Sequence, residues 1–441
     1  MADLLITLLW GSGAAAVALY LAYGGMSSWN SFGGVVTGLG IIAGLIGSDF
    51  VLVMLVLAAR VPVIDRTIGH DRAVATHRRL GKPALYLLLA HGGLLLIGYG
   101  ATTGINPIAE IGPMLALPDM PLAFIGTALF ILVVVTSLVA VRRKFSYEGW
   151  HLVHLLSYLA VIFALPHQFS DSGMLAAGTW QRVYWIALYV IALAAIVFYR
   201  FLKPIAASFR HGITVAGTTI EAPGVVSIHL RGRRLRELRS QGGQFLIWRF
   251  WTGKTWWHSH PISLSAMPSD RTARITVRGL GAGSTRIGRI PVGTPVSIEG
   301  PYGIFSDVAR TSPRLAIVAA GIGVTPVRAL LESARIAPGE ATVLLRASDE
   351  NETYLWDEMG EIAAAKGATL YTSIGHRART GPTWLAEHDA RRGVTLRSVF
   401  PELAGSDLYL CGPSSWLDSV EAEARALGVP EHQIHAERFD W

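Results

Sequence analysis

The chain is 441 residues long and 51% hydrophobic but only 16% charged, and the apolar excess is concentrated before about Leu202. Its one cysteine, Cys411, excludes a disulfide framework within the chain. The formal net charge of +7 lies largely in loops between apolar runs. That placement indicates anionic lipid as the partner and argues against nucleic acid.

Six apolar segments approach or reach the roughly 20 residues that a membrane-spanning helix needs. We expect spans at Leu4–Tyr23, Val35–Ala59, Leu80–Gly98, Pro121–Val141, Gly149–Pro166 and Val183–Leu202. Lys and Arg gather after the second, fourth and sixth spans, whereas the opposite loops contain only Arg182. By the positive-inside rule, this asymmetry predicts a multi-pass protein of the cell membrane, with both termini and the C-terminal half in the cytoplasm.

Four histidines form two pairs in this apolar half. His77 and His91 are 14 residues apart, and His154 and His167 are 13 apart. At about 1.5 Å of rise per residue, each spacing is roughly 20 Å along a helix. Metal-competent side chains at two depths of a bilayer are costly and usually functional. We therefore expect an inner haem ligated by His77 and His154, and an outer haem ligated by His91 and His167. Without a Cys-x-x-Cys-His motif, both would be b-type.

Some residues around these ligands admit two interpretations. Pro166 disfavours a regular helix directly before His167, so we expect that ligand on a distorted helix end. His151 lies one turn before His154 and competes with it, although we interpret His151 as structural. Asp49 is the one acid deep within a span. A proton relay and an internal hydrogen bond both remain open for it.

From about Ile213 the pattern changes to short β-like runs separated by turn residues, which predicts a small antiparallel barrel. The expected strands are Val225–Leu230, Gly243–Phe250, Arg274–Arg278 and Pro295–Glu299. Three motifs follow one another here: Gly243-Gln244-Phe245, His260-Pro261-Ile262-Ser263 and Gly281-Ala282-Gly283-Ser284-Thr285. In the third motif, glycines that expose backbone N–H groups before Ser and Thr suit a pyrophosphate.

From Arg314 strands alternate with helices, which predicts a parallel α/β sheet. Leu315–Ala320 leads through Gly321-Ile322-Gly323-Val324-Thr325-Pro326 into a helix at Val327–Ser333, the strand–turn–helix of a dinucleotide-binding fold. Further strands are expected at Thr342–Arg346, Thr369–Ser373 and Asp407–Cys411, with a helix near Tyr354–Ala365.

Two features of this part concern the bound nucleotide. Arg346 ends the second expected strand, where a guanidinium could hold the 2′-phosphate of NADPH. Ser348, Arg377 and Arg379 are further candidates for that contact, and NADPH is expected in preference to NADH. The terminal Trp441 is either a frayed end or a cap that stacks on an aromatic cofactor.

Taken together, the chain resembles the ferric reductase and NADPH oxidase superfamily of transmembrane flavocytochromes b over roughly residues 35–441. The matching segments are His77–Gly81 with His91, Trp150–Tyr158 with His167, His260–Ser263, Glu299–Gly303, Gly321–Pro326, Cys411–Pro413 and the aromatic terminus. The resemblance implies FAD, two haem b groups and NADPH or NADH as cofactors. Two departures are His-Pro-Ile-Ser, where oxidases commonly have an aromatic residue and Thr, and Ala320, which replaces a frequent first glycine.

The resemblance also implies roles for single residues. FAD would be held by His260, Pro261, Ile262, Ser263, Gly281, Gly283, Ser284 and Thr285, with the Ser263 hydroxyl near the reactive flavin nitrogen. The nicotinamide dinucleotide would be held by Gly321, Gly323, Thr325, Pro326, Arg346, Cys411, Gly412 and Pro413. Trp441 would cover the isoalloxazine, so Ser263, Cys411 and Trp441 are expected at the catalytic centre.

We expect three domains: a six-helix transmembrane haem domain at residues 1–204, a FAD-binding β-barrel at 205–310 and an NAD(P)-binding α/β domain at 311–441. The expected function is transfer of electrons from cytoplasmic NAD(P)H through FAD and two haems to an outer acceptor. That acceptor would be O2, giving superoxide, or a ferric chelate. Electron donation to a quinone or an extracytoplasmic protein, and a membrane redox sensor, remain open alternatives.

Overall fold

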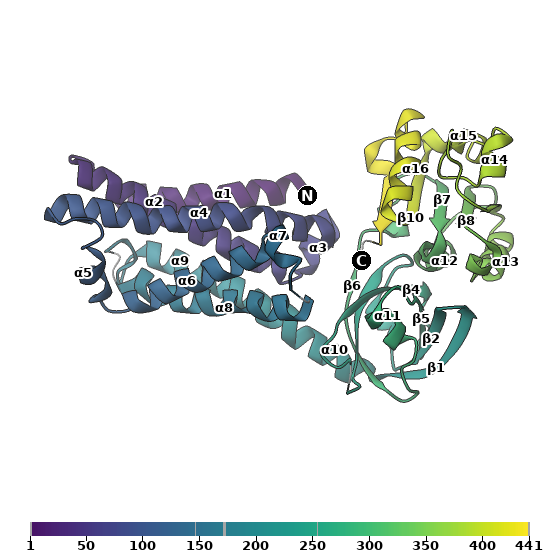
Figure 1. The fold of residues 1–441 in the computed structure, drawn as a ribbon, viewed down its shortest axis with the longest axis horizontal. Helices are drawn as coiled ribbons and strands as arrows, with labels where there is room; N and C mark the ends of the chain where they lie inside the picture. Colours follow the sequence, from purple (N-terminus) through teal and green to yellow (C-terminus); the bar gives the residue numbers. More distant parts are fainter. Residues whose placement is uncertain (1, 146, 171–172, 254, 440–441) are drawn as a thin grey trace. The chain divides into compact units, whose positions relative to one another are not determined.

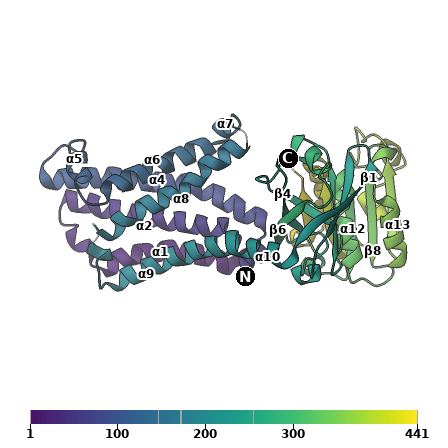
Figure 2. The same ribbon diagram turned by 90° about the horizontal axis from the view of Figure 1, so that it is seen from below.

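The computed structural model describes residues 2–145, 147–170, 173–253 and 255–439. The chain divides into two compact units, Met1–Arg200 and Phe201–Trp441. In the described residues, the first unit contains helices only, and every strand lies in the second unit (Figures 1 and 2). This division separates the apolar half of the sequence from the half with alternating strands.

Helices of the first unit run largely side by side (Figures 1 and 2). They are α1 (Ala2–Ala22), α2 (Phe32–Ala58), α3 (Pro62–Ile68), α4 (His70–Thr103), α5 (Ile111–Leu115), α6 (Met120–Ser137), α7 (Val139–Arg142), α8 (Tyr147–Ser170) and α9 (Trp180–Ile196). Among the described residues, five helical segments are long and apolar enough to cross a membrane, namely Phe32–Ala58, Arg72–Thr103, Met120–Ser137, Gly149–Ser170 and Trp180–His211. They coincide with five of the six expected spans. The remaining expected span falls on α1, whose described apolar part, Ile6–Ala22, is shorter.

Small residues bring two helix pairs of this unit into close packing. A Cβ at Gly40 of α2 would lie 3.1 Å from Leu94 Cβ of α4, and a Cβ at Gly47 would lie 3.0 Å from a methyl group of Leu88. A Cβ at Gly126 of α6 would lie 2.8 Å from the carbonyl oxygen of Ala160 in α8. Glycines let helix backbones approach closely in an apolar environment. The unit is therefore built around an α2–α4 pair and an α6–α8 pair.

The second unit begins with α10 (Lys203–His211) and a closed antiparallel barrel, as the sequence predicts. Its strands are β1 (Ile213–Ala222), β2 (Val225–Arg231), β3 (Phe245–Phe250), β4 (His260–Ala266), β5 (Thr272–Arg278) and β6 (Pro295–Tyr302), in the order β1-β2-β5-β4-β3-β6. The short helix α11 (Ala282–Ile287) follows β5. Alternate residues such as Ile228, Trp248 and Ile275 fill the interior. The His-Pro-Ile-Ser motif opens β4, a strand outside the expected set.

A five-stranded parallel sheet follows, also as predicted. Its strands are β7 (Arg314–Ala320), β8 (Ala341–Ala347), β9 (Thr369–Ile374), β10 (Ser406–Gly412) and β11 (Ile434–Arg438), in the order β11-β10-β7-β8-β9. The helices are α12 (Val324–Ser333), α13 (Trp356–Ala365), α14 (Glu387–Arg391), α15 (Leu396–Val399) and α16 (Ser414–Ala426). Ile317 of β7 packs in the core with Leu330 of α12, and Val318 packs in the core with Leu417 of α16. Because both faces are covered, β7 reads as one continuous apolar run.

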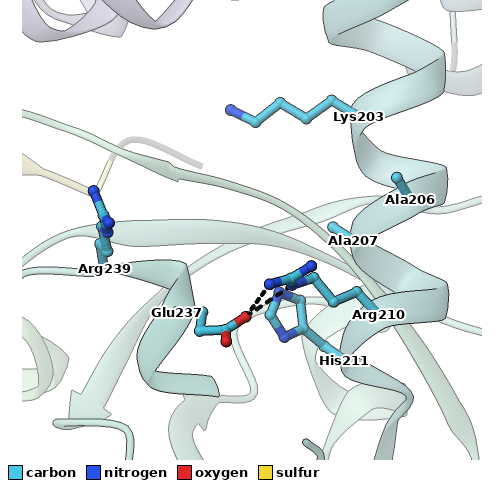
Figure 3. Close-up of a pocket in the computed structure, with 7 residues that line it drawn as sticks. All are labelled: Lys203, Ala206, Ala207, Arg210, His211, Glu237 and Arg239. Carbon is cyan, nitrogen blue, oxygen red and sulfur yellow. Dashed lines mark hydrogen bonds and ion pairs between the residues drawn. The ribbon is translucent and has the colours of Figure 1, made fainter. Parts of the chain in front are cut away.

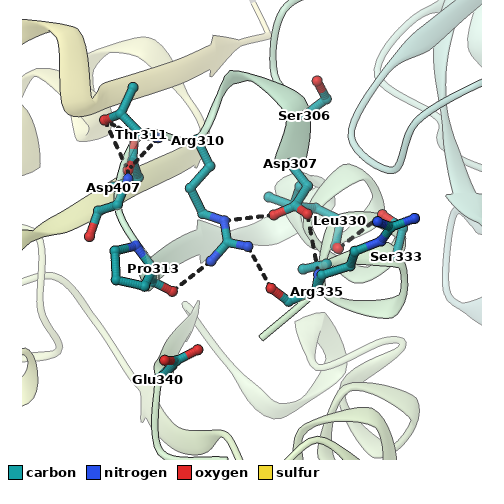
Figure 4. A network of polar contacts seen from close by, with 12 residues as sticks. Ser306, Asp307, Arg310, Thr311, Pro313, Leu330, Ser333, Arg335, Glu340 and Asp407 are labelled. Carbon is teal, nitrogen blue, oxygen red and sulfur yellow. Dashed lines mark hydrogen bonds and ion pairs between the residues drawn. The ribbon is translucent and has the colours of Figure 1, made fainter. Parts of the chain in front are cut away.

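Polar contacts hold the segment that connects the barrel to this sheet (Figure 4). The guanidinium of Arg310 pairs with Asp307 at 2.8 Å and donates to the carbonyl oxygens of Pro313 and Arg335 at 2.6 and 2.5 Å. Buried Asp407, near the start of β10, accepts hydrogen bonds from the backbone N–H groups that follow Arg310. The connection is therefore fixed at the amino end of the parallel sheet, opposite the end where its glycine turns lie.

Ion pairs join the two halves of the second unit at β5. Arg274 donates to both carboxylate oxygens of Glu358 in α13 at 2.7 Å. Arg328 of α12 donates to the same carboxylate at 2.6 Å. Arg278, four residues along β5, donates to Glu352 at 2.7 Å. The Arg274 guanidinium lowers the pKa of Glu358 to about 2, so this carboxyl is ionised throughout the neutral range.

We expect Glu358→Gln to lower the free energy of unfolding by about 1–2 kcal/mol, since it removes charge-assisted hydrogen bonds that are partly screened by solvent. A carboxyl whose pKa is lower in the folded than in the unfolded protein stabilises the folded state at pH values above its unfolded pKa. This stabilisation is lost as the pH falls through the pKa of the folded state. The difference between variant and wild type should therefore shrink between about pH 4.5 and pH 2, as thermal unfolding would measure.

Glu387→Gln is the matched control, because Glu387 pairs with Arg391 on one turn of α14 and both side chains are exposed. Such a surface ion pair contributes little to the free energy of unfolding, so its removal should leave the unfolding temperature nearly unchanged. Equal effects of the two substitutions would contradict the role given to Glu358.

Candidate functional site

The inner pair of histidines meets within the helical unit. His77 of α4 and His154 of α8 have ring centroids 6.1 Å apart, with their planes inclined at 61°. His77 Nδ1 lies 3.1 Å from the carbonyl oxygen of Met54, to which it can only donate. Its Nε2 is consequently the nitrogen left with a lone pair. Both rings are half-buried.

Two further residues position His154. Ser137 of α6 donates its hydroxyl proton to the carbonyl oxygen of Val133 at 2.7 Å. Its oxygen is then an acceptor for Trp150 Nε1 at 3.2 Å and for His154 Nδ1 at 3.3 Å. The Trp150 ring also stacks on His154, with centroids 5.0 Å apart. A proton on Nδ1 again leaves Nε2 of the imidazole as the free base.

The outer pair is held differently. His91 Nδ1 donates to the carbonyl oxygen of Gly40 at 2.8 Å, across the close α2–α4 contact. A Cβ at Gly44 would lie only 2.4 Å from the same nitrogen, so that position requires glycine. α8 continues through Pro166 to Ser170, so His167 lies within the helix and not on the distorted helix end expected from the sequence. His167 Nδ1 is buried without a hydrogen-bond partner among the described residues.

The inner pair fits a single metal ion between its rings. An imidazole nitrogen binds a first-row transition metal at about 2.0–2.1 Å, so two rings on opposite sides of one ion have centroids about 6.3 Å apart. The observed distance is 6.1 Å. The described residues contain no group of three or more His, Cys, Asp or Glu side chains placed to hold a metal ion. A metal between these rings therefore needs further ligands from a non-protein group.

Asp49 is buried in α2 and belongs to a separate polar contact. Its Oδ1 accepts a hydrogen bond from the Ser12 hydroxyl of α1 at 2.5 Å, and its Oδ2 has no hydrogen-bond partner among the described residues. Of the two alternatives for Asp49, the internal hydrogen bond is thus present, and the proton relay stays a hypothesis.

In the second unit, the second and third barrel motifs lie together. A Cβ at Gly283 would lie 3.7 Å from His260 Cε1, which brings α11 against the start of β4. His260 Nε2 is buried and has no hydrogen-bond partner among the described residues. Burial lowers the pKa of His260 to about 4, so its ring is neutral at neutral pH. Ser263, three residues along β4, is buried next to Phe245 of β3. Exposed glycine backbone at Gly283 and an unsatisfied ring nitrogen fit a polar ligand at this place.

The glycine turns of the parallel sheet also converge. β7 and β10 are neighbours, and beyond their carboxyl ends Gly323 packs on Cys411: a Cβ at Gly323 would lie 2.2 Å from the Cys411 carbonyl oxygen. Gly321 has φ +54°, a conformation that favours glycine, and lies beside Arg278 of the barrel. Thr325 and Pro326 are buried in the first turn of α12. Because the sheet order changes direction between β7 and β10, this edge is where doubly wound folds bind ligands.

Most of the expected nucleotide contacts are buried, and Trp441, expected over the flavin, is not described. Cys411 is fully buried at the end of β10, between β7 and β11. Arg346 is also buried, and its guanidinium donates to the carbonyl oxygens of Ala347 and Gly375. Gly412 is buried and Pro413 is exposed. Trp441 lies outside the described residues.

Comparisons with known proteins agree with this division. Residues 43–165 match the family model described as the ferric reductase like transmembrane component. The ferredoxin–NADP reductase B of Sorangium cellulosum is 32% identical over 173 residues, which cover 36% of this chain and 68% of that protein. The chain belongs to the ferric reductase and NADPH oxidase superfamily.

Other known proteins are similar to part of this chain. A flavohemoprotein of Vibrio cholerae is 28% identical over 186 residues, covering 40% of this chain and 45% of that protein. The chain therefore spans a little under half the length of that relative. A solved structure of the flavohem-like FAD/NAD binding domain of a nitric oxide dioxygenase from Vibrio cholerae has 23% identity and a TM-score of 0.41, covering 52% of this chain and 98% of that one.

Several residues that support these sites were not identified as such from the sequence. His154 is contacted by Ser137 of α6 and by Trp150, one turn earlier in α8. His91 is contacted by Gly44 of α2. Glu352 and Glu358 bind barrel arginines from 74 and 84 positions away. The sequence motif Trp150–Tyr158 did contain Trp150, but only the structure reveals its stacking partner.

Burial raises the pKa of the Cys411 thiol well above its usual range, so the thiol is neutral at pH 8. We expect native protein to resist alkylation by iodoacetamide at that pH, and denatured protein to react fully. Because the chain has one cysteine, intact mass reports this site alone. Native labelling as fast as that of a free thiol would contradict the burial of Cys411.

Proposed function

We propose that this protein transfers electrons from cytoplasmic NAD(P)H through FAD and two b-type haems to an acceptor at the outer face of the membrane. The observation that carries the proposal is the inner imidazole pair, whose 6.1 Å centroid spacing would let His77 and His154 hold one haem iron between them. The second pair, one level along the same two helices, supports a second haem. His77, His154, His91 and His167 are the proposed ligands.

The hydrogen bonds of the histidines support this role. Metal-bound histidines usually donate their second ring nitrogen to a carbonyl or another acceptor, which fixes the ring and its tautomer. His77, His91 and His154 each have such a partner at Nδ1. A porphyrin would supply the further metal ligands that the described protein residues lack.

When bound, FAD accepts a hydride and passes on single electrons, which the haem irons carry across the bilayer. The chain's own residues hold and orient these groups. We propose that neutral His260, Pro261, Ile262 and Ser263 contact the flavin, while Gly281, Gly283, Ser284 and Thr285 contact its pyrophosphate. For the nucleotide we propose Gly321, Gly323, Thr325 and Pro326 at its phosphates, with Cys411, Gly412 and Pro413 near the nicotinamide. Trp441 keeps its proposed place over the isoalloxazine.

The basic loops support the proposed orientation. Arg78 and Arg79 begin the apolar part of α4, and Arg142 and Arg143 follow α6, so both lie at the His77–His154 end of the helices. Excess Lys and Arg marks cytoplasmic loops. The inner haem would then lie toward the cytoplasmic side of the membrane.

An absorption spectrum of the purified full-length protein in detergent, with NADPH added in the absence of oxygen, tests the proposal. We expect split b-type bands from about two haems per chain, reduced by NADPH. Bands that dithionite reduces but neither NADPH nor NADH reduces would reject the cytoplasmic donor. A protein without haem would overturn the assignment of the histidines.

Gly44→Ala tests the outer site without changing a ligand. A methyl group there would lie 2.4 Å from His91 Nδ1, so we expect loss of about one of the two haems, measured as pyridine haemochrome per chain. Gly93→Ala is the control, because a Cβ at Gly93 of α4 meets nothing within 4 Å. Equal haem content in both variants would contradict an outer haem at His91.

The acceptor separates an oxidase from a ferric-chelate reductase. We propose O2 or a ferric chelate, reduced at the His91–His167 end of the bundle. Cytochrome c reduction that superoxide dismutase abolishes would support the oxidase. NADPH-dependent reduction of a ferric chelate without oxygen would support the reductase, and neither activity would favour a protein or quinone acceptor.

For the nucleotide, we propose that the exposed Arg379 meets the 2′-phosphate of NADPH and that buried Arg346 holds the adjoining strand end. We expect Arg379→Ala to raise KM for NADPH about tenfold, because one charge-assisted contact with the 2′-phosphate is lost. KM for NADH should stay unchanged, because NADH lacks that phosphate. Arg346→Ala should change both constants alike. A loss confined to NADPH in Arg346→Ala would instead support the sequence-based assignment of Arg346.

A further inference from the structure

Three tryptophans are exposed on one connection of the barrel. Trp251, Trp256 and Trp257 lie between β3 and β4, and they are 48%, 53% and 51% exposed. Tryptophan is usually much more deeply buried, because its ring is large and mostly apolar. An apolar group of this kind on one surface marks a place where a protein contacts a partner or a membrane. None of the three belongs to the flavin, nucleotide or haem sites proposed above.

Hydrogen bonds fix this connection to the barrel. The indole N–H of Trp251 donates to Ser297 Oγ of β6 at 2.8 Å. Thr255 is buried directly before the other two tryptophans, and its hydroxyl donates to the carbonyl oxygen of Phe250 at 3.0 Å. The exposed rings therefore extend from a turn that is held in one conformation.

Strand pairing places the connection at the end of the barrel where the chain enters it. Ile213, the first residue of β1, pairs with Val296 of β6, and Val296 also pairs with Phe250, the last residue of β3. Neighbouring strands lie about 4.8 Å apart, so the connection begins about 10 Å from the start of β1. We call this the entry end of the barrel. Val292, in the turn before β6, is a further exposed apolar residue there.

The entry end follows directly on the last segment that can cross a membrane. The helical run Trp180–His211 ends just before Ile213, and its 32 residues extend about 48 Å at about 1.5 Å per residue. The hydrocarbon core is about 30 Å thick, so the last turns of this run reach the headgroup region. Ile205 and Phe209 in these turns are exposed, which is typical of a helix at the membrane interface. The entry end of the barrel therefore lies close to the headgroups.

Basic residues gather at the same end. β2 ends beside the start of β1, and the turn that follows it, residues 231–239, contains five arginines and one glutamate. That glutamate, Glu237, accepts hydrogen bonds from Arg210 of α10 at 2.8 and 2.5 Å (Figure 3). Asp270 and Arg271, whose backbone carbonyls bind this turn, add no net charge. An excess of arginine is typical of surfaces that face the anionic cytoplasmic leaflet.

We propose that the entry end of the barrel binds the surface of the cytoplasmic leaflet, with Trp251, Trp256 and Trp257 inserted among the lipid headgroups. Tryptophan is enriched at this level of a bilayer, where its apolar ring and its polar N–H are both accommodated. Another protein surface would also cover the rings, but the arginines beside them favour lipid, because anionic headgroups balance their charge. The start of β4, where the proposed flavin contact His260 lies, would then be held at the membrane. That consequence rests on the proposed function, whereas the lipid contact does not.

The test measures what surrounds a nitroxide spin label on the full-length protein, in nanodiscs of phosphatidylcholine and phosphatidylglycerol. The labelling sites are Trp256→Cys and Trp257→Cys, made one at a time, and the native Cys411 is fully buried and should stay unlabelled. Oxygen is apolar and concentrates in lipid, whereas a polar nickel chelate stays in water. In power-saturation electron paramagnetic resonance, we expect both labels to be accessible to oxygen and shielded from the nickel chelate.

The matched control is Ile220→Cys, because Ile220 is 79% exposed on the same barrel. It lies about 23 Å along β1 from Ile213, at about 3.3 Å per residue. Its label should be accessible to the nickel chelate, and circular dichroism of all three variants should match wild type.

Two results would overturn the proposal. Labels at positions 256 and 257 that are as accessible to the nickel chelate as the label at position 220 would leave the tryptophans in water. Labels shielded from both oxygen and the nickel chelate would show that protein, and not lipid, covers them. The measurement needs neither haem nor a reduced flavin, so a failure of the proposed electron transfer would produce neither result.

Discussion

The need to satisfy polar side chains inside an apolar helix bundle is the constraint on which the first unit depends. An imidazole that loses its water without a new partner costs several kcal/mol. His77 and His91 meet this requirement by donating to backbone carbonyls of α2, and His154 donates to the hydroxyl of Ser137. In each case Nδ1 is occupied and Nε2 is available. The arrangement that makes burial tolerable is thus also the arrangement that a metal ligand requires.

Glycine has a double role in that bundle. Gly40 and Gly47 let α2 approach α4 closely, and this approach places the Gly40 carbonyl within reach of His91. Gly44, on the same face of α2, leaves the space that the His91 ring fills. Helix packing and histidine orientation therefore come from one row of small residues. A substitution there would change the site even though it replaces none of the proposed ligands.

In the second unit, the candidate site lies where the ends of neighbouring strands meet. The turns after β7 and β10 lie together because the sheet changes direction between these strands. Arg274 and Arg278 lie on strand β5 of the barrel. They form ion pairs with Glu358 and Glu352 in the half that contains the parallel sheet. These ion pairs bring Arg278 beside Gly321 and so place the barrel next to the glycine turn. A flavin held by β4 and a nucleotide held by that turn would each depend on this contact.

The sequence by itself determined the elements whose signal is local. Hydropathy located five segments that form helices long and apolar enough to cross a membrane. Short β-like runs between turn residues located the barrel, and strand–glycine–helix order located the parallel sheet. The histidine spacing along α4 and α8 was likewise readable, because helical rise is constant. Only the tertiary structure decided which groups meet. It brought Ser137 to His154 and Trp150, and it buried Arg346 against carbonyls where the strand pattern had suggested an open phosphate contact. These contacts depend on helix packing and strand order, which join positions far apart in the chain and leave no periodic pattern in the sequence.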